Sequence, residues 1–191
     1  FSGEGTITGS PADVAAYPQW FGAKGDGQTN DTTAFNKALS FFDQLYIPYT
    51  EKGYVVDELS TGAEVTIKGT GTKAPTLIAT QNTKNLFSFR KSIAKIESLA
   101  FDMTNSAENS VCFHFDNANA SLQKFRIKSI DAINPYYFVT DEDTYRKVGG
   151  SIHTHPTLVI NVHFDNISIT SPRASSFVMT DFYGFIFLRN I

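Results

Sequence analysis

The residues best suited to chemistry gather in one stretch, residues 131–155, where polar, aromatic and glycine residues interrupt the apolar patterns on either side. His153 and His155 are two positions apart, so on a strand both imidazoles would face the same side. Such a pair suits a base with a binding partner, or two metal ligands, but no third ligand stands at a helpful spacing. Asp141 and Glu142 supply carboxyls of the kind that a glycoside hydrolase uses in pairs. These four residues are our candidate catalytic groups.

The same stretch holds candidate sugar-binding residues. Tyr136 and Tyr137 have rings with an apolar face and a polar edge, which suits stacking on a sugar. Arg146 belongs to a dense charged segment that could hold a sugar. The competing interpretation is a solvated loop with ordinary histidines and with tyrosines that pack on the fold. Both interpretations stay open at the level of sequence.

Several classes of function are disfavoured. A net charge of −3 and a pI near 5.8 provide no basic field for a polyphosphate, so nucleic acid is a poor first partner. No apolar run approaches the roughly 20 residues of a membrane span, so we expect no membrane insertion. No phosphate-loop, dinucleotide, zinc or serine-nucleophile motif is present, and we expect neither a cofactor nor a metal. The lone Cys112 is expected to be a buried small apolar residue.

One helix stands out among the elements that must position these residues. Phe35, Ala38, Leu39 and Phe42 recur at helical spacing and form one apolar stripe, which predicts a helix over residues 32–43. It is short, so its stripe must cover something. We predict a structural role for the segment before the helix. Tight turns around Asp26 would use Gly22, Gly25 and Gly27, and the helix N-cap candidates are Asn30 and Asp31.

Everything after the helix has the pattern of strands and turns. A spaced pattern recurs: apolar, two residues, apolar, one residue, apolar. Its copies are residues 96–101, 122–127 and 164–169, with a fourth that starts at Leu188. Their middle positions, Leu99, Phe125, Ile167 and Ile191, lie 26, 42 and 24 residues apart, which is typical of a solenoid. The longest interval calls for an insertion of roughly 16–18 residues, which we place within residues 131–155.

Phenylalanine clusters are expected to build the core of these repeats. They are Phe87/Phe89, Phe113/Phe115 and Phe182/Phe185/Phe187, in a chain of 191 residues with 17 Phe. The strand pattern of residues 185–191 ends without a turn, so we expect the solenoid to continue beyond Ile191. Residues 1–19, rich in Gly, Ser, Thr and Pro, are expected to be a lead-in or linker, and residues 20–191 the β-domain.

Residues 21–35 read Phe-Gly-Ala-Lys-Gly-Asp-Gly-Gln-Thr-Asn-Asp-Thr-Thr-Ala-Phe, and Lys37-Ala38 follow. This segment resembles the N-terminal motif of the pectate-lyase-superfamily β-helices, Phe-Gly-Ala-x-Gly-Asp-Gly-x-Thr-Asp-Asp-Thr-x-Ala-Ile before a helix. Asn30 stands where Asp is more usual, and both residues cap helices. The resemblance implies an all-β, right-handed parallel β-helix with a short N-terminal capping α-helix.

The family includes bacteriophage tailspikes and polysaccharide depolymerases. The resemblance therefore implies a homotrimeric virion protein, made in the bacterial cytoplasm, that binds and cleaves a bacterial surface polysaccharide by hydrolysis or elimination. One alternative is a virion appendage that binds glycan, or serves as structure, without catalysis. A second is a secreted pectin-type hydrolase or lyase. The motif specifies architecture, and one fold carries many chemistries.

Overall fold

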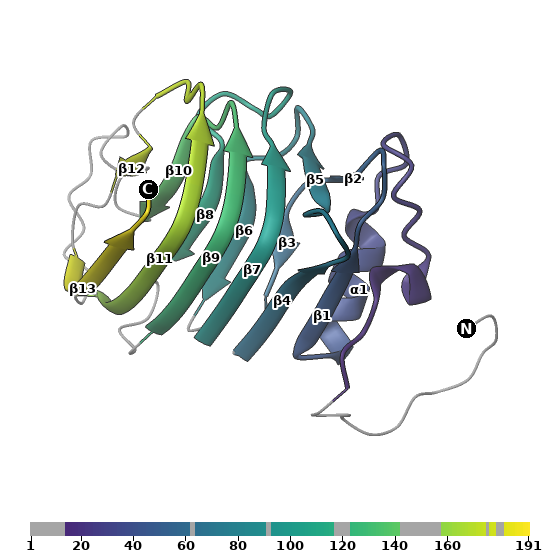
Figure 1. Ribbon diagram of the computed structural model, residues 1–191, viewed down its shortest axis with the longest axis horizontal. Coiled ribbons are helices and arrows are strands. Elements are labelled where there is room, and N and C mark those ends of the chain that lie inside the picture. The colour runs from purple at the N-terminus through teal and green to yellow at the C-terminus, as the bar shows by residue number, and fades with distance from the viewer. Residues whose placement is uncertain are drawn as a thin grey trace.

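Parallel strands dominate the protein. The computed structural model describes residues 14–61, 64–90, 93–116, 123–141, 158–174, 176–178 and 182–191. Among them, every strand pair in both sheets is parallel, and one α-helix and one short 3-10 helix lie at the N-terminal end (Figure 1). The protein is therefore mostly β, as the sequence predicted, and built from parallel sheets.

The two sheets contain eight and five strands. The larger consists of β1 (Gln44–Pro48), β2 (Tyr54–Val56), β4 (Glu64–Thr70), β5 (Thr76–Ala79), β7 (Ile93–Asp102), β9 (Gln123–Ile133), β11 (Leu158–Thr170) and β13 (Phe182–Arg189). The smaller consists of β3 (Leu59–Ser60), β6 (Asn85–Arg90), β8 (Val111–Asp116), β10 (Tyr137–Asp141) and β12 (Phe177–Val178). The helices are η1 (Pro18–Phe21) and α1 (Thr32–Phe41).

The chain passes repeatedly between the two sheets and alternates strictly from β5 onward, so strands that neighbour one another in space are far apart in sequence. Residues aligned across the long sheet form columns, one of which contains Leu45, Ile67, Ile96, Ile127, Phe164 and Leu188. Successive members of this column are 22 to 37 residues apart. Each return of the chain therefore adds one strand to the growing edge of the sheet.

The long strands change direction at a residue with positive φ. Ser98 has φ 61°, Ser129 54° and Asn166 58°, and they occupy equivalent places between paired residues of β7, β9 and β11. This left-handed conformation is uncommon outside glycine, although Asn adopts it more readily than most residues. It turns the chain so that Ile96 and Leu99, three positions apart, are both buried. The two polar residues between apolar positions in the repeat mark this corner.

The repeat alignment proposed from the sequence is wrong at its second copy. Leu99 pairs with Ile130, and Ile130 pairs with Ile167, so these intervals are 31 and 37 residues. The equivalent copy is residues 127–132, which fits the same pattern as residues 122–127. A spacing of polar and apolar residues cannot distinguish two overlapping matches, whereas strand register can.

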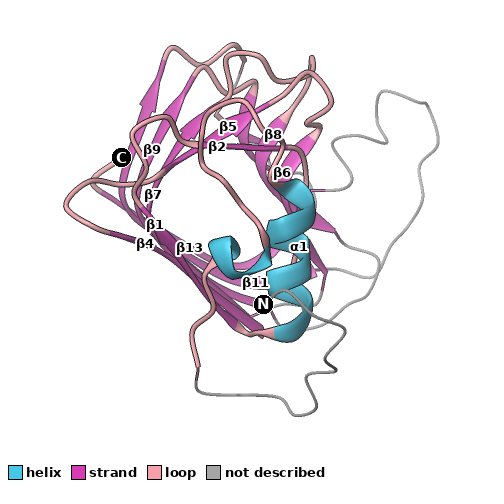
Figure 2. Ribbon diagram, turned by 90° about the vertical axis from the view of Figure 1, so that its right-hand side faces the viewer, coloured by secondary structure: helices cyan, strands magenta, loops and turns pink. Residues whose placement is uncertain are grey.

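The segment before the first strand covers the N-terminal edges of both sheets. Ala16 pairs with Leu45 of β1, and the amide of Asp31 donates to the carbonyl of Val55 in β2. Helix α1 lies at the N-terminal end of the sheets (Figure 2). Its Asn36 hydrogen-bonds the backbone of Glu58 and that of Ser60 in β3. Ala16 is also fully buried. Part of the expected lead-in therefore belongs to the folded β-domain.

Helix α1 is two residues shorter than predicted and is capped differently. It ends at Phe41, because Phe42 is extended with φ −132° and ψ 135°. Ala34, Phe35, Ala38 and Leu39 form its buried face, as the apolar stripe predicted. Asp31 occupies the N-cap position but its carboxylate makes no capping bond, whereas Asn30 Oδ1 accepts from the Thr32 amide at 3.0 Å.

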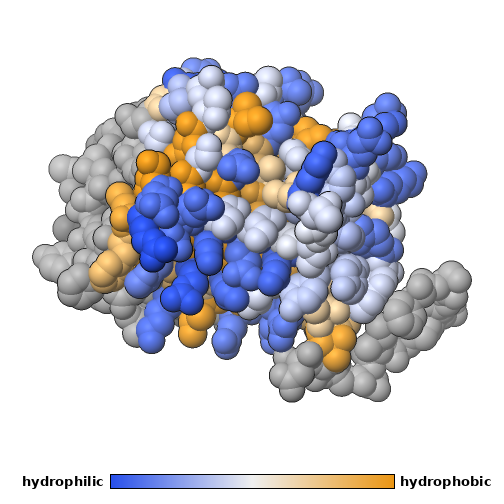
Figure 3. Space-filling model, in the orientation of Figure 1, coloured by the Kyte–Doolittle hydropathy of each residue, from blue (hydrophilic) through white to orange (hydrophobic). Residues whose placement is uncertain are grey.

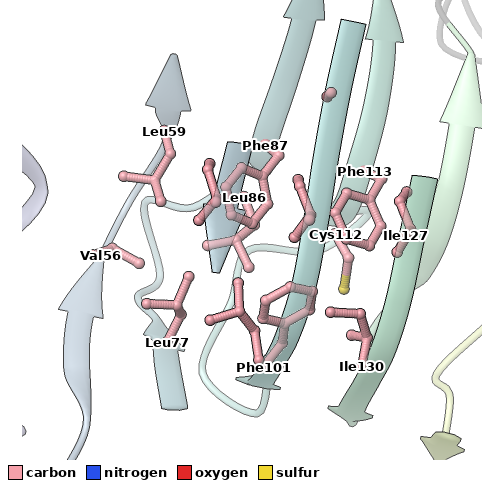
Figure 4. Packing of buried hydrophobic residues seen from close by; sticks show 14 of the residues in the cluster. Val56, Leu59, Leu77, Leu86, Phe87, Phe101, Cys112, Phe113, Ile127 and Ile130 are labelled. Carbon is pink, nitrogen blue, oxygen red and sulfur yellow. The ribbon is translucent and has the colours of Figure 1, made fainter. Parts of the chain in front are cut away.

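Side chains from both sheets share one hydrophobic core. Leu77 and Phe101 of the long sheet meet Leu86 and Phe113 of the smaller one (Figure 4). The Phe113 ring lies 5.6 Å from Phe87 and 5.5 Å from Phe101 between centroids. The predicted core roles of Phe87, Phe89, Phe113 and Phe115 are confirmed, because all four are fully buried. Cys112 is buried as predicted, and burial raises the pKa of its thiol.

The stretch expected to be an insertion is partly regular structure. Its first residues complete β9, and Tyr137–Asp141 form β10 in the smaller sheet. Residues 142–157 lie outside the described part of the chain.

Candidate functional site

The candidate catalytic residues cannot be placed in a common site. Glu142, His153 and His155 lie outside the described residues, as does the candidate binding residue Arg146. Asp141 is the last residue of β10, but its side chain is also outside what the structure describes. Their roles stay predictions.

Tyr136 and Tyr137 are described, and both are partly buried. Their rings contact each other at 5.4 Å, and the Arg173 guanidinium lies 5.3 Å from the Tyr136 ring. Arg173 also donates to the carbonyls of Asn134 and Met103, each at 3.0 Å. Tyr136 thus contacts an arginine that connects loops of successive strands, which gives its ring a structural contact. The sugar-binding roles of Tyr136 and Tyr137 stay predictions.

The Gly-rich motif before α1 makes internal contacts. Asp26 accepts from the amides of Gln28 and Thr29 at 2.9 and 2.7 Å. Mainly through the Thr29 amide, these bonds lower the pKa of Asp26 to about 2. The buried carboxylate of Asp31 accepts from the amides of Lys24 and Gly25 at 2.8 and 3.0 Å. The acidic groups of the motif are therefore occupied by backbone donors.

The glycines of the motif adopt left-handed backbone conformations, and two of them also lie close to neighbouring chain. Gly22, Gly25 and Gly27 all have positive φ, of 99°, 60° and 71°. A Cβ on Gly25 would lie 2.7 Å from Thr50 Cγ2, and one on Gly27 would lie 2.8 Å from the Lys52 carbonyl oxygen. These positions require glycine for packing against the next turn of chain.

A hollow of about 910 Å³ lies on the outer face of the long sheet, far from the motif in sequence. It spans β7, β9, β11 and β13, and hydrophilic side chains gather over the first three of these strands (Figure 3). Its basic residues are Lys95, Arg126, Lys128 and Arg189, and its acidic residues are Glu97 and Asp165. His163, Phe164, Phe187 and Leu188 complete the lining. Four basic and two acidic groups make the hollow net positive.

Strand register arranges these side chains in two neighbouring columns. Lys95, Arg126, His163 and Phe187 form one, and Lys68, Glu97, Lys128, Asp165 and Arg189 form the other. In the second column positive and negative residues alternate from strand to strand. Because neighbouring strands are only about 4.8 Å apart, opposite charges across them are favourable and hold the register.

Ion pairs occupy both acidic residues of the hollow. Glu97 contacts the Lys68 ammonium at 3.2 Å and the Lys95 ammonium at 3.3 Å, and Asp165 contacts Arg189 at 3.3 Å. Burial by itself raises the pKa of Glu97, but its two lysine partners outweigh this and keep the pKa below its ordinary value. A general acid at neutral pH needs a raised pKa, so Glu97 is suited to organising cations and not to donating a proton.

An aromatic pair lies at one side of the hollow. The His163 and Phe187 rings stack with centroids 4.4 Å apart and planes inclined by 21°. Phe187 is 50% exposed, so the prediction that it belongs to the core is wrong. It aligns with His163 and Arg126, both of which are exposed on the outer face. The strand alternation therefore turns Phe187 outward.

Sequence reasoning missed this face, although a signal was present. Residues 95 and 97, 124, 126 and 128, 163 and 165, and 187 and 189 are charged or aromatic at every second position of four strands. A period of two places such residues on one side of a sheet. The hollow becomes recognisable only once the four strands are aligned.

The chain matches no protein-family model, no curated protein and no solved structure. Among the described residues, no helix is long and apolar enough to cross a membrane. The same residues contain no group of three or more His, Cys, Asp or Glu side chains that could hold a metal ion. The chemistry of the outer face is thus the main guide to function.

Proposed function

We propose that the chain forms part of a right-handed parallel β-helix of the pectate-lyase-superfamily kind. The parallel register throughout both sheets supports this proposal, as do the corners at Ser98, Ser129 and Asn166. The N-terminal segment supports it as well, because it covers the sheet edges where a stack of coils would otherwise be open. Such a stack presents long, regular outer faces.

On this scaffold we propose that the protein binds a bacterial surface polysaccharide along the outer face of the long sheet. The observation that carries the proposal is the hollow, which combines exposed hydrogen-bonding side chains with the stacked pair His163 and Phe187. Aromatic rings pack on the apolar faces of sugars, and charged side chains bind their polar groups. Both columns cross β7, β9, β11 and β13, so they offer contacts along a chain of sugars.

The proposal assigns binding, and not bond cleavage, to this face. Both of its carboxylates are held in ion pairs, and the pKa of Glu97 is lowered. Cleavage of the polysaccharide, a trimeric assembly and a place on a phage virion are proposed from the family resemblance alone. Residues 141–155 remain the candidate source of catalytic groups.

Binding to a panel of purified capsular and O-antigen polysaccharides, both acidic and neutral, tests the proposed function. We expect measurable affinity for at least one member. Phe187→Ala should lower that affinity about tenfold, because it removes the exposed ring of the hollow. Phe41→Ala is the matched control, because Phe41 is 48% exposed on α1 and lies outside the hollow.

Two results would contradict the proposal. One is a folded protein that binds none of the polysaccharides. The other is a Phe187→Ala variant that binds as well as the parent, which would place the glycan elsewhere. Circular dichroism of each variant establishes that the fold is retained.

A further inference from the structure

Resting on the proposed function, we infer that the glycan bound in the hollow is acidic and that Arg126 and Lys128 bind a sugar carboxylate. The two residues are neighbours on one face of β9, in the middle of the hollow. Strand geometry places their Cα atoms about 7 Å apart, with both side chains directed outward.

The ion pairs of the face leave these two cations available. Lys68 and Lys95 are engaged by Glu97, and Arg189 is engaged by Asp165. Arg126 and Lys128 have no ion-pair partner within the described part of the chain, and both are exposed. The hollow therefore contains two cationic side chains that are not held in an ion pair by any described residue.

Exposure makes the surface that a ligand meets more positive than the count of charges indicates. The acidic side chains lie low, with 15% of Glu97 and 28% of Asp165 accessible, against 45% for Lys95 and 76% for Arg189. A ligand approaching from solvent thus meets ammonium and guanidinium groups first. This local field contrasts with the net charge of −3 of the whole chain.

The mixture of groups favours a sugar carboxylate over other anions. Arg126 can donate two parallel hydrogen bonds to a carboxylate, and Lys128 adds a point charge beside it. The His163–Phe187 pair lies next to Arg126 in register and offers a ring face for the same sugar or the next one. Glu97 and Asp165 flank Lys128 in its column and would repel a continuous line of phosphates or sulfates.

The experiment compares matched ligands in which only the carboxylate differs. Hyaluronan, alginate and every acidic capsule that binds in the panel are tested before and after chemical reduction of their carboxyl groups to alcohols. We expect reduction to lower affinity at least tenfold. Dextran sulfate, whose sugars carry no carboxylate, and double-stranded DNA serve as sulfate and phosphate polyanions and should bind at least tenfold more weakly than the preferred carboxylated glycan.

Variants connect the charge to the two residues. Arg126→Gln and Lys128→Gln should each lower affinity for the acidic glycan about tenfold and leave the reduced glycan unaffected. Lys37→Gln makes the same change in net charge on the exposed surface of α1 and should bind like the parent. Arg126→Lys should recover only part of the loss, because lysine lacks the planar pair of donors.

The outcomes separate the two proposals. Equal binding of native and carboxyl-reduced glycans overturns the acidic ligand and leaves glycan binding in place. Equal affinity for dextran sulfate, DNA and the acidic glycans overturns it too, because the face would then be an unselective cationic surface. Failure of every neutral and acidic polysaccharide to bind overturns glycan binding and this inference together.

Discussion

At the scale of single residues, carboxylates near the N-terminus accept hydrogen bonds from backbone amides. Asp26 binds two successive amides, and Asp31 binds the amides of Lys24 and Gly25. Charged acceptors make hydrogen bonds of this kind stronger than neutral ones do. The motif is therefore a folded unit held by its carboxylates, with glycine wherever the next turn of chain comes close.

The lowered pKa of Asp26 predicts a pH-dependent contribution to stability. The pKa is about 2 in the folded protein, against an ordinary value of 3.8. A carboxyl with a depressed folded pKa stabilises the protein above its unfolded pKa, and this contribution is lost as the pH falls through the folded value. We expect Asp26→Asn to lower the free energy of unfolding at neutral pH, and the difference from the parent to shrink between about pH 4 and pH 2.

Urea denaturation of the parent and of Asp26→Asn across this pH range measures the difference directly. A difference that stays constant with pH would contradict the role given to the ionised carboxylate.

At the scale of elements, α1 protects a strand edge. The unpaired backbone of an edge strand invites pairing with another chain. Asn36 accepts from the Ser60 amide and donates to the Glu58 carbonyl, each at 3.0 Å, so its side-chain amide replaces a neighbouring strand. The buried stripe of the helix positions this amide beside β3.

Replacing Asn36 by alanine should therefore destabilise the protein by about 1–2 kcal/mol, the net contribution of two such hydrogen bonds. Lys37→Ala, on the exposed side of the same helix, should change the free energy of unfolding by less than about 0.5 kcal/mol. Chemical denaturation at neutral pH compares the two variants. Equal losses would contradict the role given to Asn36, because alanine favours a helix at both positions and helix propensity alone would produce no loss.

At the scale of the whole molecule, stacked rings join the two sheets into one core. Phe113 of β8 contacts Phe87, Phe101 and Phe138, with ring centroids 5.6, 5.5 and 5.3 Å away. These neighbours belong to three different strands. One side chain thus connects strands that are remote in sequence.

Phe113→Ala should cost about 3–5 kcal/mol, because it removes a fully buried ring and leaves a cavity among the others. Phe113→Leu should cost clearly less, because it fills most of the space. Urea unfolding followed by circular dichroism gives both values. A loss below about 1 kcal/mol for the alanine variant would show that the core relaxes around Phe113 and does not depend on it.

The sequence by itself determined the local features of this protein. The stripe of Phe35, Ala38 and Leu39 predicted the helix, and the pattern of the residues after it predicted strands, because side-chain direction follows the backbone periods of 3.6 and 2. The Gly-rich motif was assigned a structural character for a local reason as well, the need for positive φ at Gly25 and Gly27.

Only the tertiary structure decided which strands lie side by side. Partners in the long sheet are 22 to 37 residues apart. The sequence pattern aligned Leu99 with Phe125, whereas in the sheet Leu99 pairs with Ile130. The candidate site depends on the same decision. Lys95, Arg126, His163 and Phe187 share a column because three separate strand pairings are in register, and no local pattern specifies that alignment. The alternation of residues within one strand determines which way a side chain points, whereas the pairing of several strands determines which side chains form a common binding face.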